Sequence, residues 1–343
     1  MLGLTWVKLP LYIQGHCVYW EAPQQRWLHT LMQVNRRGPV RETMGPLQKE
    51  FTMSQLKHIL VATDLSTSAH HAADRAGALS KALSVPLDLL YVANPAPFER
   101  LKQRVVPNDG LLEQVLESAK AKLLEVANTL YQHHEVSSGT RVVSGSVTTE
   151  ITHEVQDKHS SLLVCGAKGQ SMVRHLLLGS TVQRMLSRMI CPLLVVKQAP
   201  RRAYRTLLVP VDFSASSLRS IALARAIAPE AEIILLHVFE APFEGSMRFA
   251  KVDAETLTHY RNVIKKDAIE QLAALSQAAG IPGARQVVVH GDPSWRIVEQ
   301  EQEWDCDLIV MGKQGESALE ELLVGSITKH VLNESQCDVL VSV

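Results

Sequence analysis

The sequence lacks a membrane-spanning run and any paired-cysteine motif. The 343-residue sequence contains no uninterrupted apolar stretch of about 18 residues, the minimum length for a transmembrane helix. The five cysteines are scattered without a CxxC pair, so neither a disulfide framework nor a structural zinc site is predicted. The first 20 residues are interrupted by Lys8, Pro10 and His16 and are followed by no small-residue cleavage site, which argues against a signal peptide. The cytoplasm is therefore the expected compartment.

An excess of charge of either sign is also absent. Lysine plus arginine equals aspartate plus glutamate at 35 each. This balance argues against a protein that binds nucleic acid in bulk by neutralising many phosphates. Apolar residues make up 46% of the chain and charged residues 20%, as in a globular protein with a buried core. At roughly 150 residues per domain, the length predicts two domains and a remainder.

Residues 1–52 differ from the rest of the chain. They contain three of the five tryptophans (Trp6, Trp20 and Trp27), and no sustained period assigns them a helix or a strand. One interpretation is that the native chain starts at Met53 and that the preceding segment is an upstream extension, disordered or not native. The other is a true tail whose aromatic side chains dock on the body or on a partner. We favour the first.

Beyond Met53 the sequence repeats itself. The run Val61–Ser66 (VATDLS) recurs as Val209–Ser214 (VPVDFS), and Leu89–Val92 (LLYV) recurs as Leu235–Val238 (LLHV). Such a long period indicates tandem domains rather than a solenoid. We call residues 53–198 copy one and residues 203–343 copy two; proline and paired arginines mark the boundary between them.

Within each copy, short apolar runs alternate with segments of helical period. The clearest helix pattern covers residues 111–131, where apolar residues step by three and four. The short runs are apolar throughout, which is typical of strands buried on both faces. We expect strands at 58–62, 87–92, 141–143, 162–165 and 193–195 in copy one, and at 206–211, 233–238, 286–289, 307–311 and 338–343 in copy two. The pattern predicts an α/β fold of two doubly wound parallel sheets, each covered by helices on both faces. We expect five strands in each sheet in the order 3-2-1-4-5, and we expect the two sheets to pack as a pseudo-dimer through their last strands.

A glycine pattern follows the fourth predicted strand of both copies. It reads Gly-x2-Gly-x9-Gly-Ser, with Gly166, Lys168, Gly169, Gly179 and Ser180 in copy one and Gly312, Gln314, Gly315, Gly325 and Ser326 in copy two. Glycine lets a backbone approach a ligand closely and adopt positive φ, and the N–H groups at a helix start can hold an anion. The alternative is that the glycines only form turns and the serines only cap helices. Because the spacing is kept in two diverged copies, we favour phosphate binding.

Polar and apolar residues at the ends of the first two strands complete the candidate site. Thr63 and Asp64 follow the first strand of copy one, and Asp212 takes the same place in copy two. If strands one and four are neighbours, these aspartates lie beside the glycine loop. There they could accept hydrogen bonds from ribose hydroxyls, or they could cap the next helix, and the sequence leaves both roles open. Val92 and Val238 close the second strand, where an apolar side chain could contact an adenine ring.

These features together resemble the universal stress protein family, in its ATP-binding branch and its tandem, two-domain form. The resemblance covers residues from about 56 to 343 and implies an adenine-nucleotide site. By matching residues, it implies that the triphosphate, ribose and base lie near Gly166, Gly169, Gly179, Ser180, Thr181, Asp64 and Val92 in copy one. The corresponding residues of copy two are Gly312, Gly315, Gly325, Ser326, Thr328, Asp212 and Val238. The proline usually found before the third helix is present as Pro293, and copy one has Val147 there.

The two copies differ in charge near the glycine loop. Copy one carries Lys168, Arg174 and His175, whereas copy two carries Lys313 with Glu316, Glu320 and Glu321. Nearby carboxylates repel a polyanion unless they face away or hold Mg²⁺. We therefore predict tighter nucleotide binding in copy one.

Signatures of efficient phosphoryl-transfer enzymes are missing. The sequence has no GxxxxGK[ST] loop, no GxGxxG opening its first helix, no SGGxDS and no HIGH. We predict a cytoplasmic, nucleotide-dependent stress-response regulator that binds ATP, or AMP or ADP, with Mg²⁺ as a companion ion, and hydrolyses ATP slowly at most. The alternative is an enzyme or carrier acting on a nucleotide-linked metabolite. The sequence does not identify protein partners, and a homodimer of the whole chain stays open.

The histidine and cysteine patterns predict no metal site and no reactive thiol. His133, His134, His153 and His159 lack the HExxH spacing, so we expect solvated surface residues rather than metal ligands. Cys165 abuts Gly166 and would respond to oxidation if it were exposed. We expect it to be buried, as small apolar cysteines commonly are.

Overall fold

The computed structural model describes residues 6–13, 16–23, 56–96, 110–169, 178–315 and 324–343. The chain divides into two units, residues 1–52 and 53–343. In the first unit, β1 (Trp6–Ile13) and β2 (His16–Pro23) pair as an antiparallel hairpin. No sequence period predicts these strands, because the signal is a composition rich in valine, tyrosine and tryptophan. That the native chain starts at Met53 stays a prediction.

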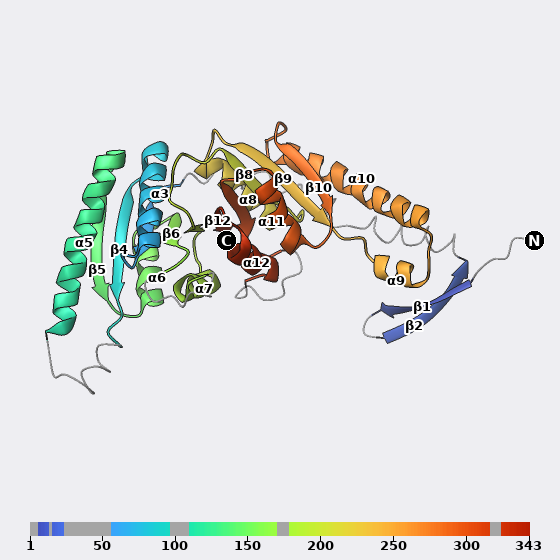
Figure 1. The fold of residues 1–343 in the computed structure, drawn as a ribbon, viewed down its shortest axis with the longest axis horizontal. Coiled ribbons are helices and arrows are strands. Elements are labelled where there is room, and N and C mark those ends of the chain that lie inside the picture. The colour runs from blue at the N-terminus through green and yellow to red at the C-terminus, as the bar shows by residue number, and fades with distance from the viewer. Residues whose placement is uncertain (1–5, 14–15, 24–55, 97–109, 170–177, 316–323) are drawn as a thin grey trace, which may run out of the picture. The chain divides into compact units, whose positions relative to one another are not determined.

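The second unit contains both copies of the repeat (Figure 1). Copy one consists of β3 (Ile59–Thr63), α3 (Thr67–Leu83), β4 (Leu87–Ala93), α5 (Leu111–His134), β5 (Ser138–Ser144), α6 (Val147–Asp157), β6 (Leu162–Gly166), α7 (Ser180–Ser187) and β7 (Leu193–Val196). Copy two consists of β8 (Thr206–Pro210), α8 (Ala215–Ile227), β9 (Glu232–Phe239), α9 (Glu244–Phe249), α10 (Ala254–Ala278), β10 (Arg285–His290), α11 (Pro293–Glu303), β11 (Leu308–Gly312), α12 (Ser326–Glu334) and β12 (Asp338–Ser342). Every predicted strand overlaps an observed one. The largest difference is β5, which begins at Ser138 rather than Arg141.

The strands of both copies form one sheet. Its order is β10-β9-β8-β11-β12-β7-β6-β3-β4-β5, which is 3-2-1-4-5 within each copy, as predicted. Pairing is parallel inside each copy and antiparallel between β7 and β12, where Leu194 faces Leu340. The predicted pseudo-dimer through the last strands is therefore confirmed, and it joins the two five-stranded sheets into a continuous sheet of ten strands.

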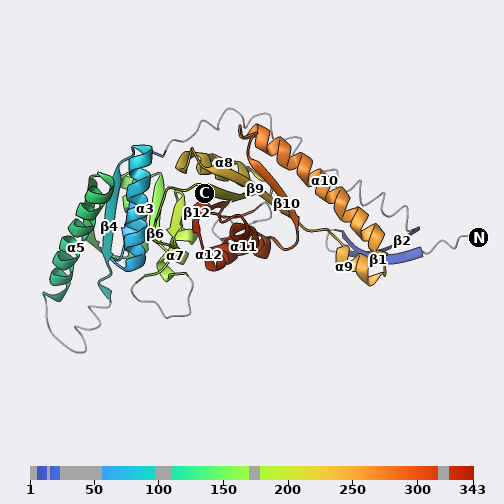
Figure 2. The same ribbon diagram turned by 45° about the horizontal axis from the view of Figure 1, so that its top comes forward.

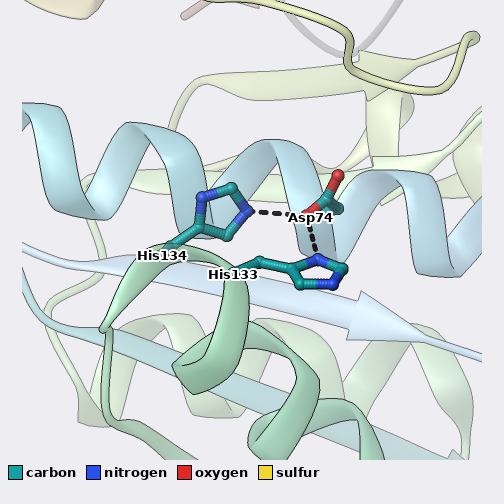
Figure 3. A group of neighbouring side chains, drawn as sticks. All are labelled: Asp74, His133 and His134. Carbon is teal, nitrogen blue, oxygen red and sulfur yellow. Dashed lines mark hydrogen bonds and ion pairs between the residues drawn. The ribbon is translucent and has the colours of Figure 1, made fainter.

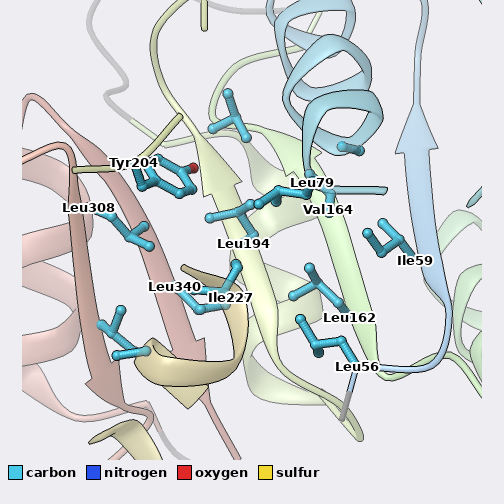
Figure 4. Close-up of a cluster of buried hydrophobic side chains, with 14 of the residues drawn as sticks. Leu56, Ile59, Leu79, Leu162, Val164, Leu194, Tyr204, Ile227, Leu308 and Leu340 are labelled. Atoms are coloured by element: carbon cyan, nitrogen blue, oxygen red, sulfur yellow. The ribbon is translucent and has the colours of Figure 1, made fainter. Parts of the chain in front are cut away.

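The sheet has a hydrophobic core on each face, and both cores continue across the junction of the copies. Successive residues of β3 alternate between them: Ile59 and Val61 face the core under α3, α5, α8 and α10, whereas Leu60 faces the core under α6, α7, α11 and α12. Figure 4 shows the first core at the junction, where Leu194 of copy one lies near Leu340 of copy two. Burial on both faces explains why these strands are apolar throughout.

The strand order determines where the crossover helices lie. The two long helices α5 and α10 each pack on the outer strands of their own copy (Figure 2). Helices of a parallel α/β sheet begin where the preceding strand ends, so their N-termini gather along the carboxyl edge of the strands. Among the helices that the structure describes, none has both the length and the apolar character needed to span a bilayer.

Candidate functional site

The structure places one cavity at the carboxyl ends of the strands of copy one. It has a volume of about 230 Å³. All nine residues predicted for a binding site in this copy line it: Thr63, Asp64, Val92, Gly166, Lys168, Gly169, Gly179, Ser180 and Thr181. The cavity opens between β3 and β6, neighbouring strands whose outgoing connections run to opposite sides of the sheet. This reversal of strand order is where open α/β sheets bind their ligands.

Three helices begin at the walls of this cavity. Ala69 in the first turn of α3, Val147 at the start of α6 and Ser180 at the start of α7 all line it. The first N–H groups of a helix have no partner within the helix, and the helix dipole adds partial positive charge at that end. Lys168 adds a full positive charge to the same wall. The cavity is therefore suited to an anionic group.

The motif glycines are required by close packing rather than by an unusual backbone angle. A β-carbon on Gly166 would stand 2.6 Å from the backbone of Ser68, and one on Gly169 would stand 2.6 Å from Oδ2 of Asp64. The two glycines of the described chain that have positive φ are Gly280 and Gly291, which lie outside the motif. The expectation of positive φ at these glycines is wrong, and close approach of their backbone to a ligand stays a prediction.

Asp64 is not the cap of the following helix. The N-cap of α3 is Ser66, whose hydroxyl accepts a hydrogen bond of 3.3 Å from the Ala69 N–H. Oδ1 of Asp64 instead accepts from the Ser66 N–H at 3.0 Å. Between them, Leu65 adopts a left-handed φ of 63°, a conformation that costs an ordinary residue roughly 1–2 kcal/mol. The turn holds the carboxylate beside Gly169, at the edge of the cavity.

The inner wall of the cavity is apolar. Leu90, Val92, Val147, Ile151 and Met185 line it. This surface would suit a flat, weakly polar ring, as small-molecule sites commonly combine apolar walls with few polar groups.

Cys165 also lines the cavity, and it is a buried thiol. Burial, followed by the negative charge of Asp64, raises its pKa to about 12. Reactivity of a cysteine requires the thiolate, so this residue is not poised for redox chemistry. The expectation that it is buried is confirmed.

Copy two has a smaller counterpart, of about 120 Å³. Its lining includes six of the predicted residues: Asp212, Val238, Gly312, Gln314, Gly315 and Thr328. Gly325 and Ser326, although described, are not part of this lining. The hydroxyl of Thr328 donates to the Gly312 carbonyl at 3.0 Å, and Ile327 occupies the position that Thr181 holds in copy one. This cavity is thus smaller and presents fewer of the predicted polar groups.

The aspartate of copy two is engaged by local serines. Oδ1 of Asp212 accepts hydrogen bonds from the Ser214 hydroxyl at 2.5 Å and from the Ser217 hydroxyl at 2.7 Å. Phe213 repeats the left-handed conformation of Leu65, with φ of 64°. The left-handed residue and the hydrogen bond from the serine N–H to the aspartate are therefore common to both copies, and in copy two the carboxylate also accepts from two serine hydroxyls.

Several residues named in the sequence analysis lie outside the described part of the chain. Those are Arg174, His175, Glu316, Glu320 and Glu321. The predicted charge difference between the loops therefore stays a prediction. Lys168 and Lys313, which belong to the same comparison, are described.

The structure adds a second hollow that the sequence did not indicate. It has a volume of about 320 Å³ and is lined by Tyr91, Gln114, Ser118 and Lys122, together with Asp64. Asp64 thus borders both hollows. Burial, followed by the charge of Asp64, raises the pKa of Tyr91. The contributing residues of α5 are separated from β3 by a long stretch of sequence, and only the packing of the helix brings them there.

The fold defines a tandem pair of doubly wound α/β domains joined through their fifth strands, each with a cavity at the reversal point. The universal stress protein family model matches residues 55–197 and 203–342. The chain belongs to the universal stress protein family, with two such domains in tandem.

Similar proteins agree with this assignment. A universal stress protein of Mycobacterium tuberculosis is 24% identical over 310 residues, covering 83% of this chain and 94% of that protein. The universal stress protein YxiE of Bacillus subtilis is 30% identical over 145 residues, covering 40% of this chain and 98% of that protein. The crystal structure of a universal stress protein from Archaeoglobus fulgidus has the same fold, with a TM-score of 0.61, 21% identity and coverage of 84% of this chain and 98% of that one.

Proposed function

We propose that copy one binds an adenine nucleotide, ATP or its di- or monophosphate, and that the protein acts as a nucleotide-dependent regulator of the cytoplasmic stress response. The observation that carries the proposal is the convergence of all nine predicted residues of copy one on one cavity at the reversal point of the sheet. The glycine pattern, which resembles that of the ATP-binding branch of the family, supports the same ligand.

The lining suggests how the ligand would lie. The phosphates would lie against Gly166, Gly169 and the first turn of α7, where backbone N–H groups and the helix dipole favour negative charge. Asp64 would accept from the ribose hydroxyls, and Val92 with the other apolar residues would contact the base. Catalysis is not part of the proposal, since positioned N–H groups alone would give slow hydrolysis at most.

Copy one is proposed as the principal site. Its cavity has about 230 Å³ against about 120 Å³ in copy two. Ser180 and Thr181 line the first cavity, whereas Ser326 and Ile327 hold those positions in copy two and only the apolar Ile327 lines its cavity. The smaller volume of the copy-two cavity, and the absence from its lining of the two hydroxyl groups that begin α7 in copy one, predict weaker binding of a polyphosphate there.

The test is an isothermal titration of the full chain with ATP, ADP and AMP, with and without Mg²⁺. Gly179→Val and Gly325→Val are the matched variants, because each glycine precedes the helix that follows its loop and has an extended backbone that valine can adopt. We expect wild type and Gly325→Val to bind and Gly179→Val to lose binding. If only Gly325→Val loses binding, copy two is the principal site. If wild type binds none of the three nucleotides, the proposed function is wrong.

A second function is favoured by one observation, the hollow lined by Tyr91 and Lys122 that shares Asp64 with the nucleotide cavity. A ligand longer than a nucleotide could extend past Asp64 into it, as an adenylated or otherwise nucleotide-linked metabolite would. Mass spectrometry of small molecules that copurify under native conditions distinguishes the regulator from the carrier or enzyme. ATP or AMP supports the regulator, and a larger conjugate supports the carrier or enzyme.

A further inference from the structure

His134, expected to be a solvated surface residue, is partly buried in the structure. His134 is 21% exposed, and its Nε2 lies 2.6 Å from Oδ1 of Asp74 on α3. The neighbouring His133 also turns toward Asp74, with 3.7 Å between its Nδ1 and the same oxygen (Figure 3). Two adjacent side chains in the last turn of α5 thus converge on one carboxylate of another helix.

We propose that Asp74, His133 and His134 form a binding site for a divalent transition metal ion of the Zn²⁺ type. One ligand atom of each residue lies within 4.8 Å of the other two. Tetrahedral zinc, with bonds of about 2.0–2.2 Å, places its ligand atoms roughly 3.3 Å apart. The carboxylate oxygen lies 3.7 Å from Nδ1 of His133 and 2.6 Å from Nε2 of His134. The shorter contact is a hydrogen bond, so a bound ion would replace its proton and the two atoms would move apart by roughly 0.7 Å. Three protein ligands would leave the fourth position for water.

A glycine makes room for this cluster. Gly77 is buried in the interior of α3, where glycine is unfavourable compared with alanine. A β-carbon there would stand 2.7 Å from Cδ2 of His134 and 3.0 Å from Leu130. Gly77 and Asp74 are three residues apart and therefore lie on the same face of α3. The glycine allows the imidazole to approach the helix closely enough to meet the carboxylate.

Copy two has a positively charged side chain at the position that corresponds to Gly77. Counted from the N-cap serines Ser66 and Ser214, Arg225 holds the position of Gly77. Its Nη1 donates to the carbonyl of Ala279 at 3.1 Å, just before the left-handed Gly280 that ends the long helix α10. In copy one the left-handed Glu135 follows α5 in the same way, directly after His134.

A positive charge is favourable at a helix C-terminus because the carbonyl groups there carry partial negative charge. Arg225 supplies it in copy two. Copy one has glycine instead, with two imidazoles and a carboxylate around the space, which is a donor set that zinc commonly takes. Lys81, the next basic residue along α3, is paired with Glu135 at the protein surface. The cluster shares no residue with the cavity of either copy, so the proposal is independent of nucleotide binding.

The experiment is an isothermal titration of the full chain with Zn²⁺ alone, together with the absorption spectrum of the Co²⁺ form. We expect one site that is lost or weakened about a hundredfold in Asp74→Asn and His133→Ala, since even outer-shell changes commonly cost 10–100-fold in metal affinity. His133 is 60% exposed, so its replacement should leave the fold intact. Tetrahedral Co²⁺ should absorb strongly in wild type and not in these variants.

Two further variants test whether Zn²⁺ binding depends on this cluster in particular. Gly77→Ala improves helix propensity but adds a β-carbon 2.7 Å from Cδ2 of His134 and 3.0 Å from Leu130, so the two effects on stability oppose each other. It should displace His134 and weaken Zn²⁺ binding at least tenfold, and urea unfolding checks that the variant is folded. His153→Ala is the matched control, because His153 pairs with Asp157 at 3.1 Å but this pair offers two ligands rather than three. It should bind Zn²⁺ like wild type. The proposal is overturned if wild type takes up no Zn²⁺, or if Asp74→Asn and Gly77→Ala bind it as tightly as wild type.

Discussion

Oδ2 of Asp64 lies 2.6 Å from the position that a β-carbon on Gly169 would occupy. In copy two the corresponding distance, from Asp212 to Gly315, is 2.8 Å. In both copies the carboxylate of the aspartate that follows the first strand therefore packs closely against the loop that follows the fourth strand. A β-carbon at either glycine would force the aspartate carboxylate to shift, which makes the second motif glycine a probe of each cavity separately.

Gly169→Ala should weaken ATP binding by at least tenfold. The added methyl group forces Asp64 or the loop to move, and overpacking of this kind commonly costs about 1–3 kcal/mol of stability as well. The matched variant Gly315→Ala makes the same steric change in copy two and should lower stability to a similar extent while ATP affinity stays near that of wild type. Titration calorimetry and urea unfolding measure the two effects. Equal losses of affinity in both variants would show that the copies share the binding.

Native Cys165 should resist alkylation. With its pKa raised to about 12 by burial and by Asp64, only a minute fraction of the thiol is ionised at neutral pH, and the side chain is 8% exposed. Iodoacetamide at pH 7.5 should label Cys165 only after unfolding in urea, as read by peptide mass spectrometry. Rapid labelling of the native protein at this residue would mean that the cavity wall opens.

Lys197 should make stability depend on pH in the alkaline range. Its ammonium donates hydrogen bonds of 2.6 Å to the carbonyl and the hydroxyl of Ser335. Burial nevertheless lowers its pKa to about 8, against an ordinary 10.5, although Cys337, Glu301 and Asp338 act in the opposite direction. Below pH 8 the lysine is charged in both states, and the folded state bears the cost of burying that charge. Between pH 8 and 10.5 the folded state releases the proton and the unfolded state keeps it, so stability rises with pH.

The comparison with Lys197→Met isolates this effect, since other titrating groups are common to both proteins. The free energy of unfolding of wild type should increase relative to the variant by up to about 3 kcal/mol between pH 8 and 10.5, at 1.36 kcal/mol per unit of pKa. Urea unfolding at several pH values gives the difference. A difference that stays constant over this range would place the lysine at an ordinary pKa.

The strands could be predicted from the sequence because burial on both faces leaves a pattern of apolar runs that needs no knowledge of contacts. Their order, and the nine residues of the copy-one cavity, could be predicted because the repeated glycine motif and the strand-end residues resemble a family of known fold. The hydrogen-bond partners of individual side chains could not be predicted. That Ser66 rather than Asp64 caps α3, and that Thr328 bonds to the Gly312 carbonyl, depends on distances of a few tenths of an ångström.

Contacts between residues far apart in the sequence could not be predicted either. Asp74 and His134 are 60 residues apart and meet only because α3 and α5 pack together. Leu65 and Phe213 have left-handed backbones although neither residue type favours them. Their shared position after the strand-end aspartate was visible in the repeat, but the residue types carried no signal for the conformation.

Tyr204→Phe should destabilise the junction of the two copies. The Tyr204 hydroxyl donates a 2.6 Å hydrogen bond to Oδ2 of Asp338, the first residue of β12, and the Arg75 guanidinium from copy one lies 4.1 Å from the centre of the tyrosine ring. Burial raises the pKa of Asp338, and the hydrogen bond from Tyr204 opposes that rise. Removing the hydroxyl keeps the ring and its contact with Arg75 but leaves a buried carboxyl group with one donor fewer.

The expected loss is about 1.5–3 kcal/mol, the range for a hydrogen bond to a charged group. Tyr260→Phe is the control: its hydroxyl donates to the Pro242 carbonyl at 2.9 Å, a neutral acceptor within copy two, and should cost about 0.5–1.5 kcal/mol. Urea unfolding of both variants at pH 7 measures the two losses. If Tyr204→Phe costs no more than Tyr260→Phe, Asp338 is neutral when buried, and the junction depends on the pairing of β7 with β12 and on the two shared cores rather than on this polar contact.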